Sequence, residues 1–121
     1  MLNCLCVGLG GFVGSILRYL VGLIPVDTAN GFPVKTLVIN VLGAFALGLI
    51  AAIAAKDSTI DPRLVLMLKV GVCGGFTTFS TFAFEAASLM QNGQSTLGIT
   101  YMLLSMLLGV GAVILAQMLI N

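Results

Sequence analysis

Four long apolar stretches dominate the chain, and short polar segments separate them. The stretches cover residues 2–24, 33–55, 62–90 and 96–120. Each reaches the roughly 20 mostly apolar residues that a helix needs to cross a bilayer. The pattern predicts an all-α integral membrane protein, with residues 1–121 in a single membrane domain of four transmembrane helices. Connections this short make neighbouring spans antiparallel and place both termini on one side.

Composition supports this class and excludes several functions. The chain is 60% hydrophobic and 7% charged, whereas a soluble domain carries about 25% charged residues. Nine charges with a net charge of +1 form no basic patch for nucleic acid. The chain has no histidine and no nucleophile–base pair, so we expect no enzyme site. Cys4, Cys6 and Cys73 lie in apolar segments, and we expect small buried side chains rather than disulfides or metal ligands.

The first span carries Gly10, Gly14, Arg18 and Gly22 at four-residue spacing, so these residues share one helix face. Glycines on such a face let a neighbouring helix approach closely. Arg18 then either points into the protein or extends to the membrane surface, and the sequence leaves both possibilities open. No basic residue precedes Arg18, so we expect a retained helix rather than a signal peptide.

Polar residues also recur on one face of the second and the fourth span. Thr36, Asn40 and Gly43 share a face of the second span, and Asn40 lies about one turn inside the membrane. Its amide has either a functional role or a role in bonding helices together. Tyr101 and Ser105 are four residues apart on the fourth span. Tyr101 belongs either to a polar stripe or to an interfacial aromatic belt.

The length and the sequence of the third span predict a broken helix. A continuous helix over residues 62–90 would be about 43 Å long, whereas the hydrocarbon core is about 30 Å thick. Residues 71–82 read GVCGGFTTFSTF, and paired glycines followed by two threonines form a poor helix. We therefore expect a break at residues 74–78. Irregular backbone at this depth is tolerated only where protein buries it or where it lines water.

Chemically useful side chains follow the expected break. Phe79 and Phe82 are three residues apart and share a face, and Ser80 and Thr81 add hydroxyls. Glu85 is the one carboxylate inside a span. Its role is either that of a proton carrier or that of a structural hydrogen-bond acceptor. The polar groups in the spans are mostly uncharged donors, which can replace the hydration shell of an anion. Phenyl ring edges are electropositive and can also approach an anion.

The charges leave the orientation of the chain nearly undetermined. Lys56 and Arg63 lie on the side of the termini and Lys35 lies on the other, a bias too small to fix the topology. The chain is expected either to insert both ways round or to take one orientation for another reason. Because four helices enclose little space, we also expect an oligomer.

Residues 71–82 resemble the signature of the Fluc fluoride channels, also called CrcB-type, and the likeness covers essentially the whole chain. Residues 10–14 with Arg18 and residues 36–43 match as well, whereas the fourth span matches more loosely. The resemblance implies an antiparallel, dual-topology homodimer in the plasma (inner) membrane, with two fluoride pores that are each lined by both subunits.

The resemblance also implies roles for individual residues. It places a sodium ion at the dimer centre, held by backbone carbonyls at Gly74 and Thr77. Lys35 stands where the family usually has glycine, and Arg18 and Glu85 remain further candidates. The implied fluoride pore is lined by Asn40, Phe79, Phe82, Ser80, Thr81, Tyr101 and Ser105.

The implied activity is passive export of fluoride from the cytoplasm. Hydrogen fluoride crosses bilayers as a neutral acid and ionises inside, and a channel lets the trapped anion leave. One alternative is a small proton-coupled drug exporter, which needs a carboxylate in its first span; residues 1–24 contain none. A second alternative is a non-transporting membrane assembly subunit, in which the polar residues only hold helices together.

Overall fold

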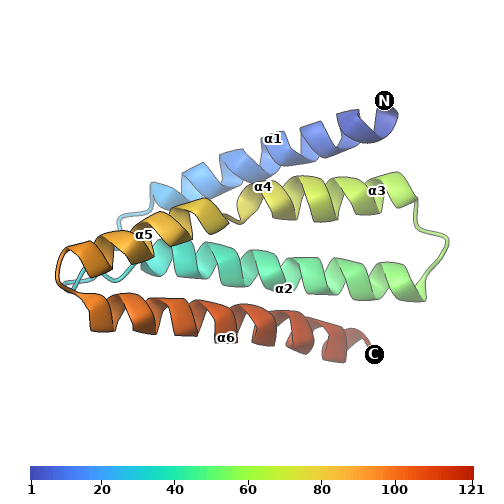
Figure 1. Cartoon of the computed structure of the whole chain (residues 1–121). Helices are drawn as coiled ribbons and strands as arrows, with labels where there is room; N and C mark the ends of the chain where they lie inside the picture. The colour runs from blue at the N-terminus through green and yellow to red at the C-terminus, as the bar shows by residue number, and fades with distance from the viewer.

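The computed structural model describes residues 1–121 as a bundle of helices without strands (Figure 1). Three spans are uninterrupted helices, which are α1 (Leu2–Gly22), α2 (Val34–Lys56) and α6 (Ser95–Ile120). The third span consists of α3 (Pro62–Leu66), the π-helical segment η1 (Met67–Cys73), α4 (Gly74–Phe76) and α5 (Phe79–Gln91).

All four spans are long and apolar enough to cross a membrane, with ends close to the expected ones. The connection between α2 and α3 lies at the same end of the bundle as both termini (Figure 1). The other two connections lie at the opposite end, beside the end of α1 and the end of α5. The expected antiparallel arrangement of neighbouring spans is therefore confirmed.

The break in the third span is narrower than expected. Helical geometry ends at Thr77, with ψ of 159°, and Thr78 is extended at φ −150° and ψ 117°. The break thus lies within the expected residues 74–78, but Gly74 and Gly75 themselves remain helical. Gly75 allows close packing, because a Cβ there would lie 2.8 Å from the carbonyl oxygen of Gly11, whereas the nearest atom to a Cβ on Gly74 is the Lys69 carbonyl oxygen at 3.9 Å. The π-helical segment before them was not expected.

Glycines bring α1 against η1 and α4. Gly10 and Gly14 are buried, and a Cβ on either would collide with the backbone oxygen of Met67 or Val72. A Cβ on Gly71 would lie 2.8 Å from the Cα of Gly10. The close approach expected from the four-residue spacing is thus confirmed for two of the three glycines. Gly22 has no atom near its Cβ position and takes no part.

Replacing Gly14 with alanine is expected to destabilise the protein by about 1–3 kcal/mol, because backbone atoms must move to admit the methyl group. Gly8→Ala is the matched control on the same helix, since nothing lies within 4 Å of its Cβ position. The two variants are compared by thermal unfolding in detergent. The melting temperature is the temperature at which the monodisperse peak in size-exclusion chromatography is lost. Equal melting temperatures would show that this helix contact is loose.

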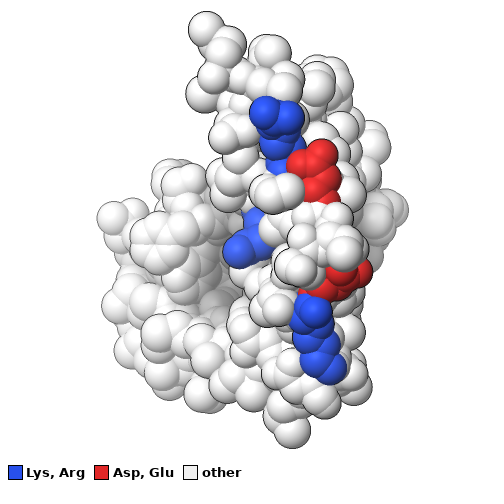
Figure 2. All heavy atoms as spheres, turned by 90° about the vertical axis from the view of Figure 1, so that its right-hand side faces the viewer, with Lys and Arg blue, Asp and Glu red and all other residues white.

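Apart from Arg18, Lys69 and Glu85, which lie within the spans, the charged residues lie at the ends of the bundle. Figure 2 shows the charged side chains at the end of the α2–α3 connection, gathered in one column on an otherwise uncharged surface. Lys56 Nζ donates to the carbonyl oxygen of Ile120, and at the other end Lys35 Nζ donates to that of Gly22 at 3.1 Å. Each lysine thus binds a carbonyl at the C-terminus of a helix, where a cation is favourable.

The single chain buries few residues. Only 16 of 121 are buried, and one cluster of Ala86, Leu89 and Tyr101 forms the core between α5 and α6. Most large apolar side chains face outward, as expected for helices that meet lipid or another subunit. Cys73 is buried as expected, whereas Cys4 is exposed on the outer side of α1, which corrects our expectation for that residue.

Candidate functional site at the helix break

Asn40 on α2 pairs with the backbone of the break. Its Nδ2 donates to the carbonyl oxygen of Thr78 at 3.0 Å, and the backbone N–H of Thr78 donates to Asn40 Oδ1 at 2.8 Å. The side-chain amide therefore satisfies both backbone groups of an extended residue, as a neighbouring peptide would. A buried backbone group in a membrane interior needs such a partner.

Thr78 also begins the second half of the broken span. Its Oγ1 accepts from the backbone N–H of Thr81 at 3.1 Å and lies 3.4 Å from Ser80 Oγ. This is the N-cap of α5. Our sequence-based site omitted Thr78. The signal that would have identified Thr78 is its place directly before the helix that follows the break, where threonine is a preferred N-cap residue.

Two carbonyls at the break lose their helical donors. In a continuous helix, Gly74 O would accept from Thr78 N–H and Thr77 O from Thr81 N–H. These two N–H groups donate instead to Asn40 Oδ1 and to Thr78 Oγ1. The oxygens at the positions expected to hold sodium are therefore among those that the break deprives of helical partners.

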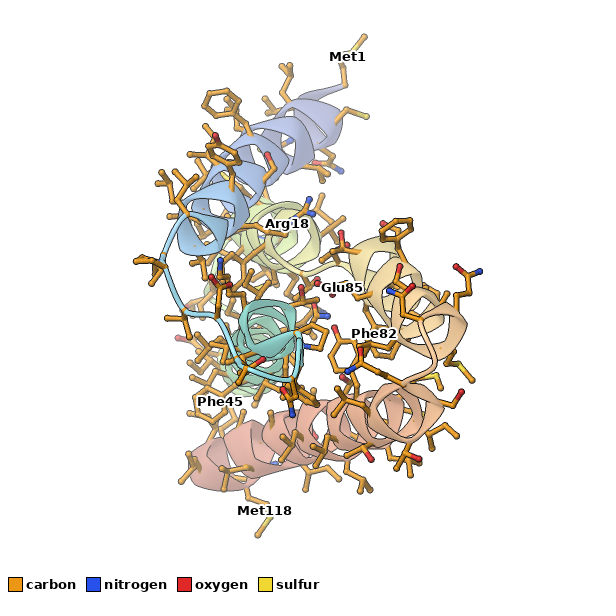
Figure 3. All side chains as sticks on the ribbon, turned by 90° about the vertical axis from the view of Figure 1, so that its left-hand side faces the viewer. Met1, Arg18, Phe45, Phe82, Glu85 and Met118 are labelled. Carbon is orange, nitrogen blue, oxygen red and sulfur yellow. The ribbon has the colours of Figure 1, made fainter.

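Arg18 points into the protein rather than to the membrane surface. Its Nε donates to the carbonyl oxygen of Gly75 at 3.1 Å, at the C-terminal end of α4. In Figure 3 the Arg18 side chain reaches from α1 toward the broken span. The structure thus decides between the two possibilities that the sequence left open. A guanidinium here also opposes the partial negative charge of a helix C-terminus.

Glu85 is held by two hydroxyls from other spans. Thr36 Oγ1 donates to Glu85 Oε2 at 3.0 Å, and the Tyr101 hydroxyl donates to Oε1 at 2.9 Å. Tyr101 is fully buried, so it belongs to the interior and not to an interfacial belt. Figure 3 shows Glu85 and Phe82 among the helices rather than on the outside. In this geometry Glu85 is an acceptor that joins α5 to α2 and α6.

Aromatic rings pack around Tyr101, whose hydroxyl donates to this carboxylate. Phe82 meets Tyr101 edge to face, with centroids 5.1 Å apart, and Phe32 meets Tyr101 from another side at 5.4 Å. Phe79 contacts Phe82 at 5.8 Å, which confirms that the two rings share a face of α5. Phe79 is 78% exposed in the single chain, whereas Phe82 is half-buried.

A groove of about 430 Å³ runs along the break, between α2 and α6. Ser105 lines it, and the buried Ser105 Oγ has no hydrogen-bond partner. Tyr101 lies behind Phe82 rather than in the groove, and Ser80 and Thr81 lie on the exposed side of α5. Of the residues expected in the pore or at the sodium site, the groove brings together Asn40, Thr77, Phe79, Phe82 and Ser105.

A second hollow, of about 480 Å³, opens at the end of the bundle where α1 joins α2. Glu85, Lys35 and Thr28 are among its lining residues. Glu85 and its two hydroxyl partners therefore lie between the hollow at this end and the groove at the break.

Comparison with known proteins agrees with this architecture. The family model described as CrcB-like protein, Camphor Resistance (CrcB), matches residues 5–117, which is nearly the whole chain. The chain belongs to the CrcB family. CrcB membership accounts for all four spans together, since the match begins in the first turn of α1 and ends in the last turn of α6.

Curated relatives of this CrcB chain carry a functional name. The chain is 40% identical over 120 residues to the "Fluoride-specific ion channel FluC" of Ruminiclostridium cellulolyticum, covering 98% of this chain and 92% of the relative. It is 45% identical over 95 residues to the protein of the same name from Chlorobaculum tepidum, covering 78% and 75%. A third such protein, from Chlorobium phaeobacteroides, is 42% identical over 106 residues, covering 88% and 83%.

In this CrcB protein, Tyr101→Phe is expected to lower the free energy of unfolding by about 1–3 kcal/mol, because Glu85 loses a donor inside the bundle. Tyr19→Phe is the control, since Tyr19 is 67% exposed. Chemical unfolding in detergent micelles measures both. If the two substitutions cost the same, the bond between Tyr101 and Glu85 does not hold the spans together.

Proposed function

We propose that this chain is a fluoride-selective passive channel through which fluoride leaves the cytoplasm. The observation that carries the proposal is the groove at the break, where an amide, a hydroxyl without a partner and phenyl rings converge. These groups suit a small, strongly hydrated anion, which exchanges water for N–H and O–H donors. Relatives that share most of the chain are named as fluoride-specific channels, which supports the same ion.

Fluoride would travel along the groove past Asn40, Phe82 and Ser105. Asn40 supplies an amide N–H, and Ser105 supplies a hydroxyl that no group of the chain occupies. The rings of Phe79 and Phe82 would turn their electropositive edges to the ion. Tyr101 would support the path from behind Phe82 through its contact with Glu85.

We propose further that the working unit is an antiparallel dimer with dual topology. Phe79, Ser80 and Thr81 start a half-helix inside the third span, yet all three are exposed in the single chain. Hydroxyls at this depth need cover from protein or water, and a second copy would provide it. Arg18 is held inside the bundle, so Lys56 and Arg63, with Lys69 added if its side chain reaches this end, oppose Lys35 at the other end. A bias of one or two charges permits both orientations.

Sodium is proposed as the structural ion at the dimer centre. Backbone oxygens of Gly74 and Thr77 suit a hard cation, and both lack their helical donors at the break. When bound, the ion would supply positive charge to these oxygens. Dimer stability and fluoride flux are expected to fall when a large organic cation replaces sodium during purification. Unchanged stability and flux after verified removal of sodium would contradict this part of the proposal.

A proton-coupled exporter is not supported. Such a mechanism needs a carboxylate that is free to exchange protons with water on both sides. The first span has no acidic residue, and both oxygens of Glu85 accept hydrogen bonds from neighbouring spans.

The passive mechanism is tested in liposomes loaded with potassium fluoride at neutral pH. Valinomycin sets an inside-negative potential, and a fluoride electrode follows efflux through the purified protein. Efflux is expected to continue unchanged when a protonophore collapses any pH gradient. Efflux that stops without a pH gradient would show coupling to protons and would contradict a channel.

A further inference from the structure

One face of α2 contacts the broken span at three successive points. Thr36 bonds Glu85, Asn40 bonds Thr78, and Gly43 lies against Thr77. A Cβ on Gly43 would collide with the Thr77 methyl group, so glycine lets the Thr77 side chain pack directly against α2. The three residues share a face because they are spaced by four and three positions.

We propose that Asn40 is a positioning residue whose side chain acts as a splint across the break. The amide holds the backbone of Thr78 in register with α2, and through Thr78 it fixes the first turn of α5. The part of this inference that concerns flux rests on the proposed function. The structural part does not, because it concerns only the bonds between α2 and the break.

The two bonds to Thr78 leave one N–H of the Asn40 amide free, and they fix its direction. Asn40 has two N–H donors and one carbonyl acceptor. The acceptor and one donor are used by the N–H and the carbonyl of Thr78. One N–H remains, and its direction is fixed because the other two functions are bonded. A residue bound only to the ion would have no such constraint on its rotamer.

The splint also explains how the break stays stable without a regular helical hydrogen bond at Thr78. Thr78 is 9% exposed, so its backbone groups are almost without access to solvent. Without Asn40 both groups would remain unsatisfied in the interior, which is costly. The break would then open to water, and Phe79 and Phe82 would lose their present orientation, because they lie in the first turn of α5.

The first test measures hydrogen exchange at the Thr78 amide by NMR in detergent without fluoride. Asn40→Leu keeps the size of the side chain and removes both bonds, and it is expected to speed exchange by about tenfold or more, as loss of a protecting hydrogen bond does. Asn92→Leu is the matched control in an exposed turn and should leave this amide unchanged. Equal exchange in the wild type and in Asn40→Leu would overturn the proposal.

The second test leaves every side chain intact. Replacing Thr78 with its α-hydroxy acid analogue puts an ester in place of the peptide N–H that Asn40 accepts. The same analogue at Thr96 is the control, because Thr96 lies in the first turn of α6, where N–H groups have no helical partner. Fluoride flux is expected to fall at least fivefold for the ester at Thr78 and to stay at the wild-type rate for the ester at Thr96.

Combining the Thr78 ester with Asn40→Leu separates the splint from other effects of the ester. If Asn40 acts through Thr78, the double variant loses much less flux than the product of the two single losses. Losses that simply multiply, or an ester at Thr78 that leaves flux unchanged, would overturn the proposal. A wild type that conducts no fluoride would instead overturn the proposed function, and the exchange experiment would still decide the role of Asn40.

Discussion

Replacing Asn40 with aspartate is expected to abolish fluoride conduction while the protein remains assembled. The substitution removes the donor to Thr78 O and sets a carboxylate oxygen against that carbonyl. It also puts a negative charge beside the groove that fluoride would follow. Two like charges about 4 Å apart repel by about 4 kcal/mol at an effective dielectric constant of about 20, which corresponds to a rate loss on the order of a thousandfold.

Efflux from liposomes measures this effect, and size-exclusion chromatography of the same sample verifies assembly. Asn92→Asp is the matched control, because it makes the same chemical change in an exposed turn. It should conduct like the wild type. Normal flux in a correctly assembled Asn40→Asp protein would show that fluoride does not pass this amide.

Phe82→Ile is expected to lower fluoride flux by at least tenfold with little loss of stability. Isoleucine keeps most of the apolar bulk but removes the aromatic ring that lines the groove and, with it, the electropositive edge proposed to meet the ion. It also removes the edge-to-face contact with Tyr101, whose centroid lies 5.1 Å away. Such a contact is worth about 0.5–1.5 kcal/mol, so the protein should remain folded.

The control for this prediction is Phe12→Ile on α1, where the ring is 65% exposed and lies outside the groove. Fluoride efflux and thermal unfolding are measured for both variants. If Phe82→Ile conducts at the wild-type rate, the ring only fills space between α5 and α6. If Phe12→Ile is equally impaired, loss of an aromatic ring has a general effect on the bundle.

The four spans were predictable because the requirement for crossing a membrane is simple. A bilayer demands about 20 apolar residues in one helix, and no competing pattern of this chain meets that demand. The face shared by Gly10 and Gly14 was predictable for a similar reason, since spacing alone decides which residues lie side by side. Gly22 shows the limit of this reasoning, because the face continues while the partner helix does not.

The details of the break depend on contacts that spacing does not reveal. Paired glycines are poor helix formers, yet Gly74 and Gly75 stay helical, and α1 packs closely against Gly75. The break falls instead at Thr77 and Thr78, where α2 supplies an amide to replace the missing helical bonds. The sequence placed Asn40 on the correct face but contained no sign of its partner.

The cluster around Glu85 illustrates the same limit for the site. Thr36, Glu85 and Tyr101 come from three different spans, and each was noted as a polar residue inside the membrane. Their hydrogen bonds depend on how the spans are packed, which no single-span pattern specifies. The roles of Ser80 and Thr81 remain predictions, because both lie on the exposed side of α5 in the single chain.

Selectivity is the central claim, and one measurement tests it most directly. Liposomes containing only this chain are loaded with equal concentrations of fluoride and chloride, and ion-selective electrodes follow both anions under the same imposed potential. The groove offers hydrogen-bond donors and ring edges but no wide cationic opening. Fluoride is therefore expected to leave rapidly while chloride is retained by a large factor. Comparable efflux of the two anions, or retention of both, would contradict the account.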